Sequence, residues 1–276
     1  MGGKQALCST ILQRFPPGFR SMIYVEVFGG GGSVLLNKER SVREILNDAN
    51  GNLINLYRVV REHPDELKDR LLYVLHNRED FKIAQRRLAQ FSYSDPVLRA
   101  ADFYQVIRQS YAGNGKQFCT VARSMWAGFP AIDRVCSRLQ GVTLENEDFE
   151  AILARYDSPT TVFYIDPPYF FTEDYYPGKI FLPSDHRRLA NLLFGVEGRW
   201  LLSYNLCPEV LALYEKPGIL IEQVERINNM AQRYESGAVY REVLISNYDT
   251  RKSAQTQLHL FEPAAEERKI LWNGLY

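Results

Sequence analysis

The chain has 276 residues, of which 46% are hydrophobic and 24% are charged, and these globular fractions exclude wholesale disorder, collagen and coiled coil. Lys and Arg number 33, as do Asp and Glu, so the formal net charge is zero at pH 7, which excludes a basic surface over the whole chain. A nucleic-acid substrate stays open, because the electrostatic field depends on where the charges lie.

The four cysteines carry no metal-binding or disulfide pattern. None is spaced as C-x-x-C, and no histidine cluster accompanies them. We therefore expect no metal site and a reducing, cytoplasmic setting. The first ten residues lack the apolar core of a signal peptide, and no apolar run approaches the ~18 residues that span a bilayer. We expect no membrane contact.

The N-terminal part predicts the opening of a doubly wound α/β domain. A β-branched and aromatic run is followed by four glycines, a helix start with Ser33 as its cap, and a second strand with a polar end. This order, strand, glycine loop, helix and strand, is typical of nucleotide-binding α/β folds. The expected segments are helix 5–15, strand 22–28, glycines 29–32, helix start 33–39 and strand 43–50.

The middle of the chain predicts helices rather than a sheet. Four amphipathic patterns follow one another over 52–110, and a stretch rich in Gly and aromatic residues, 111–131, precedes a further helix over 132–140. Residues 58–140 contain 14 Lys and Arg against 9 Asp and Glu, a balance of +5, which leaves −5 for the rest. We therefore predict two domains, 1–57 joined with 141–276, and 58–140.

Residues from 141 onward return to the α/β pattern. Apolar runs predict strands, and the last two strands suit an antiparallel hairpin. The intervening helix has Ser184 as its expected cap. The expected segments are strand 142–149, helix 151–156, a strand running into a turn over 161–169, helix 184–196, strand 199–205 and strands 219–227 and 241–249.

The strongest chemical signal is Asp166-Pro167-Pro168-Tyr169, directly after an apolar strand. Ligands of open α/β sheets bind beyond the carboxyl ends of strands. Two prolines make a stiff turn without N–H donors, so the Asp166 carboxylate and the Pro167 carbonyl are acceptors in a fixed place. With the Tyr169 ring they suit an exocyclic amino group on a planar heterocycle. A rigid turn that only ends the strand is the alternative.

The glycine run 29–32 is the second signal. Glycines after a strand allow a ligand close to the backbone and open a helix N-terminus. The run matches neither a Walker phosphate loop nor the strict G-x-G-x-x-G pattern. Asp48 ends the next strand, 17 residues after Gly31, where a carboxylate accepts from ribose hydroxyls. A simple glycine turn and a turn-forming Asp are the alternatives.

Together these motifs resemble a known family. Gly2-Gly3-Lys4, the F-G-G-G-G loop, N-D-A-N after the second strand, E-D-F at 147–149, D-P-P-Y at 166–169 and S-Y-N at 203–205 occur in the order found in the Dam-type (D12 class) DNA adenine-N6 methyltransferases. The resemblance extends over nearly the whole chain. It implies a Rossmann-like, S-adenosylmethionine-dependent methyltransferase domain with an inserted, mostly helical target-recognition domain.

The resemblance also implies roles for individual residues. It implies S-adenosyl-L-methionine as methyl donor and N6 of a flipped adenine in double-stranded DNA as acceptor. The implied catalytic residues are Asp166, Pro167, Pro168 and Tyr169; the implied donor-binding residues are Lys4, Phe28, Gly29, Gly30, Gly31, Asp48, Asp148, Phe149 and Asp166; and Ser203, Tyr204 and Asn205 are implied to line the target pocket.

The basic segment 58–140 suits phosphate contacts. Its candidates for DNA contact are Arg108, Asn114, Lys116, Arg123 and Arg138, and the stretch 111–128 is the favoured base reader. For any one of these side chains, a solvated helix face is the alternative. We expect a monomer or weak dimer associated with DNA, with a restriction-modification, phage or genome-marking role all open.

Two other functions remain open. The same D-P-P-Y acceptors would serve an RNA adenine or a protein amide, and a relative that has lost catalysis would keep only donor or DNA binding. Hydrolase chemistry has no support, since the sequence holds no G-x-S-x-G elbow and no triad spacing.

Overall fold

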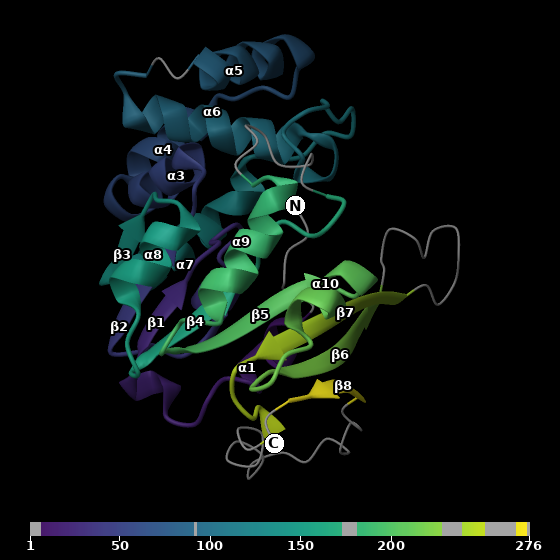
Figure 1. Ribbon diagram of the computed structural model, residues 1–276. Helices are drawn as coiled ribbons and strands as arrows, with labels where there is room; N and C mark the ends of the chain where they lie inside the picture. The colour runs from purple at the N-terminus through teal and green to yellow at the C-terminus, as the bar shows by residue number, and fades with distance from the viewer. Residues whose placement is uncertain (1–6, 91–92, 173–180, 228–238, 252–268, 275–276) are drawn as a thin grey trace.

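A computed structural model describes residues 7–90, 93–172, 181–227, 239–251 and 269–274 (Figure 1). Within these ranges the strands form one sheet in the order β3-β2-β1-β4-β5-β7-β6-β8. The pairs among β1 to β5 are parallel, and β7, β6 and β8 continue the sheet with antiparallel pairs. The strands are β1 Ile23–Glu26, β2 Arg43–Asn47, β3 Val142–Glu145, β4 Thr161–Ile165, β5 Arg199–Asn205, β6 Leu220–Ile227, β7 Val239–Ser246 and β8 Lys269–Asn273.

The order of strands confirms the doubly wound α/β prediction. From β1 the chain moves outward through β2 and β3, and it then returns to the other side of β1 with β4 and β5. The order therefore reverses between β1 and β4, and ligands of such sheets bind at this switch point. Glu26 pairs with Tyr164, so the two strands end nearly level. The glycine loop and the Asp166 turn thus leave the sheet side by side.

Helices cover both faces of the parallel part of the sheet. Val25 packs with helices on one face, whereas its neighbour Tyr24 packs in a second core on the other, because successive strand residues point to opposite faces. Figure 1 shows α8, α9 and α10 across the face toward the viewer. The helices are α1 Cys8–Leu12, α2 Ser33–Asn37, α3 Gly51–Glu62, α4 Pro64–Leu72, α5 Arg78–Gln90, α6 Pro96–Gln109, α7 Phe129–Leu139, α8 Phe149–Tyr156, α9 Pro183–Leu193 and α10 Pro208–Tyr214.

Helices α3 to α7 all lie between β2 and β3 in the chain, as the middle segment predicted. They enclose two apolar clusters of their own, one around Leu67 and Leu71 and one around Phe81 and Phe103. Figure 1 shows α4, α5 and α6 stacked beyond one end of the sheet. The helices begin at Gly51, next to the predicted residue 52, and residue 58, the predicted domain boundary, lies inside α3. Its role as a recognition domain stays a prediction.

Both predicted serine caps are wrong. Ser33 is the first residue of α2, and Gly32 precedes it in a left-handed conformation with φ of 63°. Helix α9 starts at Pro183, and the Asp185 carboxylate, not Ser184, accepts the N–H of Leu182 at 2.7 Å. The sequence patterns also did not predict α10 or β8.

Candidate active site

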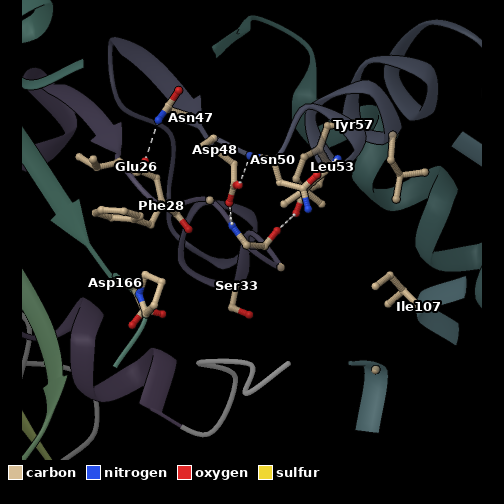
Figure 2. A pocket seen from close by; sticks show the side chains of 18 of the residues that line it. Glu26, Phe28, Ser33, Asn47, Asp48, Asn50, Leu53, Tyr57, Ile107 and Asp166 are labelled. Atoms are coloured by element: carbon tan, nitrogen blue, oxygen red, sulfur yellow. Dashed lines mark hydrogen bonds between the residues drawn. The ribbon is translucent and has the colours of Figure 1, made fainter. Parts of the chain in front are cut away.

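A cavity of about 670 Å³ lies at the carboxyl ends of β1, β2 and β4 (Figure 2). Its lining comes from the glycine loop, the ends of these three strands, and helices α3, α6 and α8. A volume of ~300–1,000 Å³ is typical of sites for cofactors and other small ligands. The predicted residues that line it are Phe28, Gly29, Gly30, Gly31, Asp48, Arg108, Arg123, Asp148, Phe149, Asp166 and Pro168.

The glycine loop is shaped by backbone contacts that a side chain would break. The N–H of Gly29 donates to the carbonyl of Asn47 at 2.6 Å, and a Cβ on Gly29 would lie 2.9 Å from that same oxygen. Gly30 and Gly32 have φ of 47° and 63°, values that favour glycine. The loop therefore holds its backbone at the cavity wall because its residues lack side chains.

Asp48 ties this loop to the start of α3. One carboxylate oxygen accepts the N–H of Gly30 at 2.9 Å, and the other accepts the N–H of Asn50 at 2.8 Å (Figure 2). Tyr57 of α3 donates its hydroxyl to the carbonyl of Gly30 at 2.8 Å. Burial raises the pKa of Asp48, and the two backbone N–H groups oppose that rise. Asp48 thus lines the cavity and also fixes its shape.

Three phenylalanines form the apolar wall of the cavity. The ring centroids of Phe28 and Phe149 lie 5.7 Å apart, and Phe181 lies 5.7 Å from the first and 5.8 Å from the second. The motifs indicated Phe28 and Phe149. They missed Phe181, because a single phenylalanine in an apolar stretch carries no motif.

Asp148 and Phe149 are held by a residue that the sequence did not indicate, Arg188 of α9. Its guanidinium binds the Asp148 carboxylate at 2.8 Å and lies over the Phe149 ring, 4.1 Å from the centroid. Asp148 is also the N-cap of α8 and accepts the N–H of Glu150 at 2.9 Å. Arg188 therefore braces one end of the cavity from a helix 40 residues further along the chain.

The motifs imply S-adenosylmethionine as methyl donor, and S-adenosylhomocysteine is the same molecule without the transferred methyl group. We predict that Arg188→Ala weakens binding of S-adenosylhomocysteine about fivefold, because a partly exposed ion pair and a cation–π contact each contribute up to about 1 kcal/mol. Isothermal titration calorimetry of the two proteins measures the change. Arg187→Ala is the matched control, since Arg187 is the exposed neighbour on the same helix. Equal affinity of both variants would contradict the bracing role.

Asp166 follows β4 directly and is oriented by β5. The hydroxyl of Ser203 donates to a carboxylate oxygen of Asp166 at 2.9 Å and lies 3.1 Å from the hydroxyl of Tyr164. Asp166 and Pro168 line the cavity, whereas Pro167 and Tyr169 do not. The turn after β4 therefore presents its carboxylate to the cavity from a prearranged position.

The three residues predicted for the target pocket lie against the Asp166 turn and are not among the cavity-lining residues. Ser203 is fully buried beneath Asp166. Tyr204 is a core residue whose hydroxyl contacts Nδ1 of His186. The side-chain oxygen of Asn205 accepts the N–H of Phe170 at 3.2 Å. These residues support the turn from behind.

Glu26, the last residue of β1, was missed because a single glutamate inside the expected strand 22–28 carries no motif. Glu26 is 2% exposed, and its carboxyl accepts the N–H of Leu35 at 2.8 Å and the hydroxyl of Tyr24 at 2.7 Å. Burial raises the pKa of Glu26 to about 8, with the charge of Asp166 adding to the rise. At neutral pH this acid is therefore largely protonated beside Asp166.

The residues predicted to contact DNA lie in three different environments. Arg108 and Arg123 line the cavity. Lys116, which lies between them in the chain, is exposed. The Asn114 side chain accepts the N–H of Lys116 at 2.8 Å, so it shapes its own turn. Arg138 instead binds the buried Glu44 carboxylate through two nitrogens, at 2.5 and 2.8 Å. We therefore leave Arg138 out of the proposed DNA surface.

Other sequence predictions concern features beyond this cavity. Lys4 lies outside the described residues. Within the described ranges, no group of three His, Cys, Asp or Glu side chains is placed to hold a metal ion. All four cysteines are free. No helix among the described residues has the length and apolar character to cross a membrane.

Comparison with known proteins agrees with the motifs. The model of the D12 class N6 adenine-specific DNA methyltransferases matches residues 1–117 and 130–233. The DNA adenine methylase of Escherichia coli (strain K12) is 32% identical over 185 residues, a match that spans 61% of this chain and 62% of that protein.

Two further relatives align over more of the chain. The DNA N-6-adenine-methyltransferase of Escherichia phage P1 is 26% identical over 263 residues, or 88% of this chain and 34% of the phage protein. The type II methyltransferase M1.LlaDCHI of Lactococcus lactis subsp. cremoris is 24% identical over 274 residues, or 90% of this chain and 93% of that protein. Because the family model covers most of its length, the chain belongs to the D12 class N6 adenine-specific DNA methyltransferases.

Proposed function

We propose that the protein transfers a methyl group from S-adenosylmethionine to N6 of an adenine in double-stranded DNA. The observation that carries this proposal is the position of the Asp166–Tyr169 turn. It leaves the sheet beside the glycine loop, and Asp166 shares one cavity with Asp48. The names of the relatives, DNA adenine methylase among them, support DNA as the substrate.

We propose that this cavity holds the methyl donor, because its volume lies in the range of small-ligand sites. We propose that the Asp48 carboxylate accepts from its ribose hydroxyls, that the wall around Phe28 and Phe149 contacts its adenine ring, and that Asp148 accepts from its exocyclic amino group. The two Asp48 oxygens each bind one backbone N–H and retain lone pairs for a ligand. When bound, the donor supplies an electrophilic methyl carbon on its sulfonium sulfur.

Asp166 and the Pro167 carbonyl are the proposed acceptors for the two hydrogens of the target amino group. The lone pair of that nitrogen is delocalised into the adenine ring, which makes it a poor nucleophile. Hydrogen bonds to two fixed acceptors favour a more tetrahedral nitrogen, aimed at the methyl carbon. As the N–C bond forms, the C–S bond breaks and S-adenosylhomocysteine leaves, and the proton that the nitrogen loses passes to the Asp166 carboxylate. Ser203 donates to Asp166 at 2.9 Å and holds it in place. We propose that positioning and electrostatics supply most of the catalysis.

The target base is out of reach inside a duplex, so we propose that it flips out and stacks on the Tyr169 ring. We propose as phosphate contacts Arg108 and Arg123, which line the cavity, and the exposed Lys116. Arg123 and Lys116 are exposed, as phosphate contacts require.

Alanine substitution tests these contacts separately. We expect Arg123→Ala and Lys116→Ala each to lower the slope of log Kd against log salt concentration by about 0.9, because each phosphate contact releases counterions. Fluorescence anisotropy with a labelled duplex measures the slope. Arg199→Ala is the control, since this exposed residue begins β5 at the end of the strand opposite to the turn. Unchanged slopes in both test variants would contradict the placement.

The decisive experiment incubates the purified protein with S-adenosylmethionine and unmethylated genomic DNA, followed by single-molecule sequencing for N6-methyladenine. Methylated adenines in a common sequence support the proposal and give the recognition site. Parallel reactions with RNA and with protein test the same chemistry on another amino group. Binding of DNA without methyl transfer to any of them would indicate a relative that has lost catalysis.

A further inference from the structure

The hydroxyl of Tyr169 is bound to a distant strand. It donates a hydrogen bond to a carboxylate oxygen of Glu242, a fully buried residue of β7, 73 residues further along the chain. Stacking on a base uses only the face of an aromatic ring. Stacking therefore does not require the hydroxyl, and in the structure the hydroxyl links the turn to the sheet.

The neighbour of Glu242 in the sheet holds the next residue of the turn. Glu242 pairs with Asn205 across β7 and β5. The Asn205 amide accepts the N–H of Phe170 at 3.2 Å and donates to its carbonyl at 3.5 Å. Glu242 and Asn205, which pair across the strands, thus hold consecutive residues of the turn. Glu242 binds the side chain of Tyr169, and Asn205 binds the backbone of Phe170.

The rings behind the turn restrict it further. The Phe170 ring stacks on His186, with 3.7 Å between centroids and 14° between planes. The Tyr169 ring lies 5.8 Å from the ring of Tyr204, whose hydroxyl contacts His186. The backbone at Phe170 is held by Asn205, so the Tyr169 side chain could still rotate. Its hydrogen bond to Glu242 restricts that rotation.

We propose that Glu242 is a positioning residue that sets the orientation of the Tyr169 ring before the target base arrives. The inference rests on the proposed function, in which Tyr169 stacks on the flipped adenine. A buried carboxylate that accepts from a hydroxyl makes a strong, directional bond. A ring held in one orientation presents the base to Asp166 at a fixed angle, and small misplacements of reacting groups cost rate steeply.

A double-mutant cycle tests this role. We expect Tyr169→Phe and Glu242→Leu each to lower the single-turnover methylation rate about tenfold, with the Kd for S-adenosylhomocysteine unchanged within about twofold. The double variant should be no slower than the slower single variant, because both substitutions remove the same bond. Glu242→Gln keeps an acceptor and should retain at least about a third of the wild-type rate.

Glu222→Leu is the matched control. Glu222 is another buried glutamate of the same sheet, on β6, and it accepts the hydroxyl of Thr250. Melting temperatures separate unfolding from loss of rate, and the folded control should keep the wild-type rate. If Glu242→Leu does not fold, Tyr169→Phe decides alone, and a wild-type rate in that variant overturns the proposal.

The remaining outcomes separate this inference from the function on which it rests. Additive losses in the double variant, or a wild-type rate in Glu242→Leu, overturn the positioning role and leave the methyltransferase intact. Absence of adenine methylation by the wild-type protein overturns the proposed function, and the positioning role with it.

Discussion

Asp166→Ala is expected to lower methyl transfer to DNA adenine by about 10³-fold or more, because the amino nitrogen loses an acceptor that is already in place when the base arrives. Ser203 donates to this carboxylate at 2.9 Å, so the acceptor is preorganised. Ser203→Ala should show a smaller loss, about tenfold, since it leaves the carboxylate but frees its orientation. Transfer of labelled methyl groups to duplex DNA measures both.

Donor binding separates catalysis from folding in these variants. Asp48 and Phe28 line the same cavity and remain in place when Asp166 is substituted. Asp166→Ala should therefore raise the Kd for S-adenosylhomocysteine by less than about tenfold. Asp69→Ala, at an exposed position on α4, is the matched control and should transfer methyl groups at the wild-type rate. Methyl transfer near the wild-type rate by Asp166→Ala would refute the catalytic assignment.

Glu26 is expected to make the protein less stable as the pH rises from 4.5 to about 8. Its pKa is raised from 4.5 to about 8, so in this range the folded protein binds a proton that the unfolded chain has released. The free energy of unfolding therefore falls, by up to about 1.4 kcal/mol per pH unit, and the fall ends above the folded pKa. Urea unfolding at several pH values should show this slope reduced in Glu26→Gln.

Glu44 provides the opposite case within the same sheet. It is also buried, but hydrogen bonds from Arg138 and Lys38 lower its pKa despite the burial. Its contribution to stability is present above pH 4.5 and is lost as the pH falls through the folded pKa. Glu44→Gln should therefore have a lower free energy of unfolding than wild type at neutral pH, and the difference should shrink in acid.

For Glu26, the contradicting outcome is a free energy of unfolding that changes with pH in the same way in Glu26→Gln and in wild type.

The motifs predicted the parts of the site that local chemistry dictates. A run of glycines after a strand and two prolines after Asp166 restrict the backbone by themselves, so their turns could be expected without knowing the rest of the fold. The helix and strand patterns of the α/β body were likewise local, since they depend on the spacing of apolar residues. Local patterns failed at the ends of elements, as at Ser33, where Gly32 in a left-handed conformation precedes the helix.

The supporting residues could not be predicted in this way. Arg188 touches Asp148 from 40 residues away, and Glu242 touches Tyr169 from 73 residues away. A pair of arginines on a helix and a single glutamate in a strand carry no motif. Their partners are set by which helix packs at the end of which strand, and, for Glu242, by the register between β5 and β7.

The sequence by itself determined the chemical groups of this protein: a glycine loop, the Asp48 carboxylate, and a stiff Asp-Pro-Pro-Tyr turn. Their physical basis is local, in backbone conformation and in the absence of N–H donors at proline. The tertiary structure alone decided that β1 and β4 are neighbours, which brings groups more than 100 residues apart into one cavity. It also decided the orientation of each group, because the buried side chains that hold Asp166 and Tyr169 come from strands that pair only in the folded sheet.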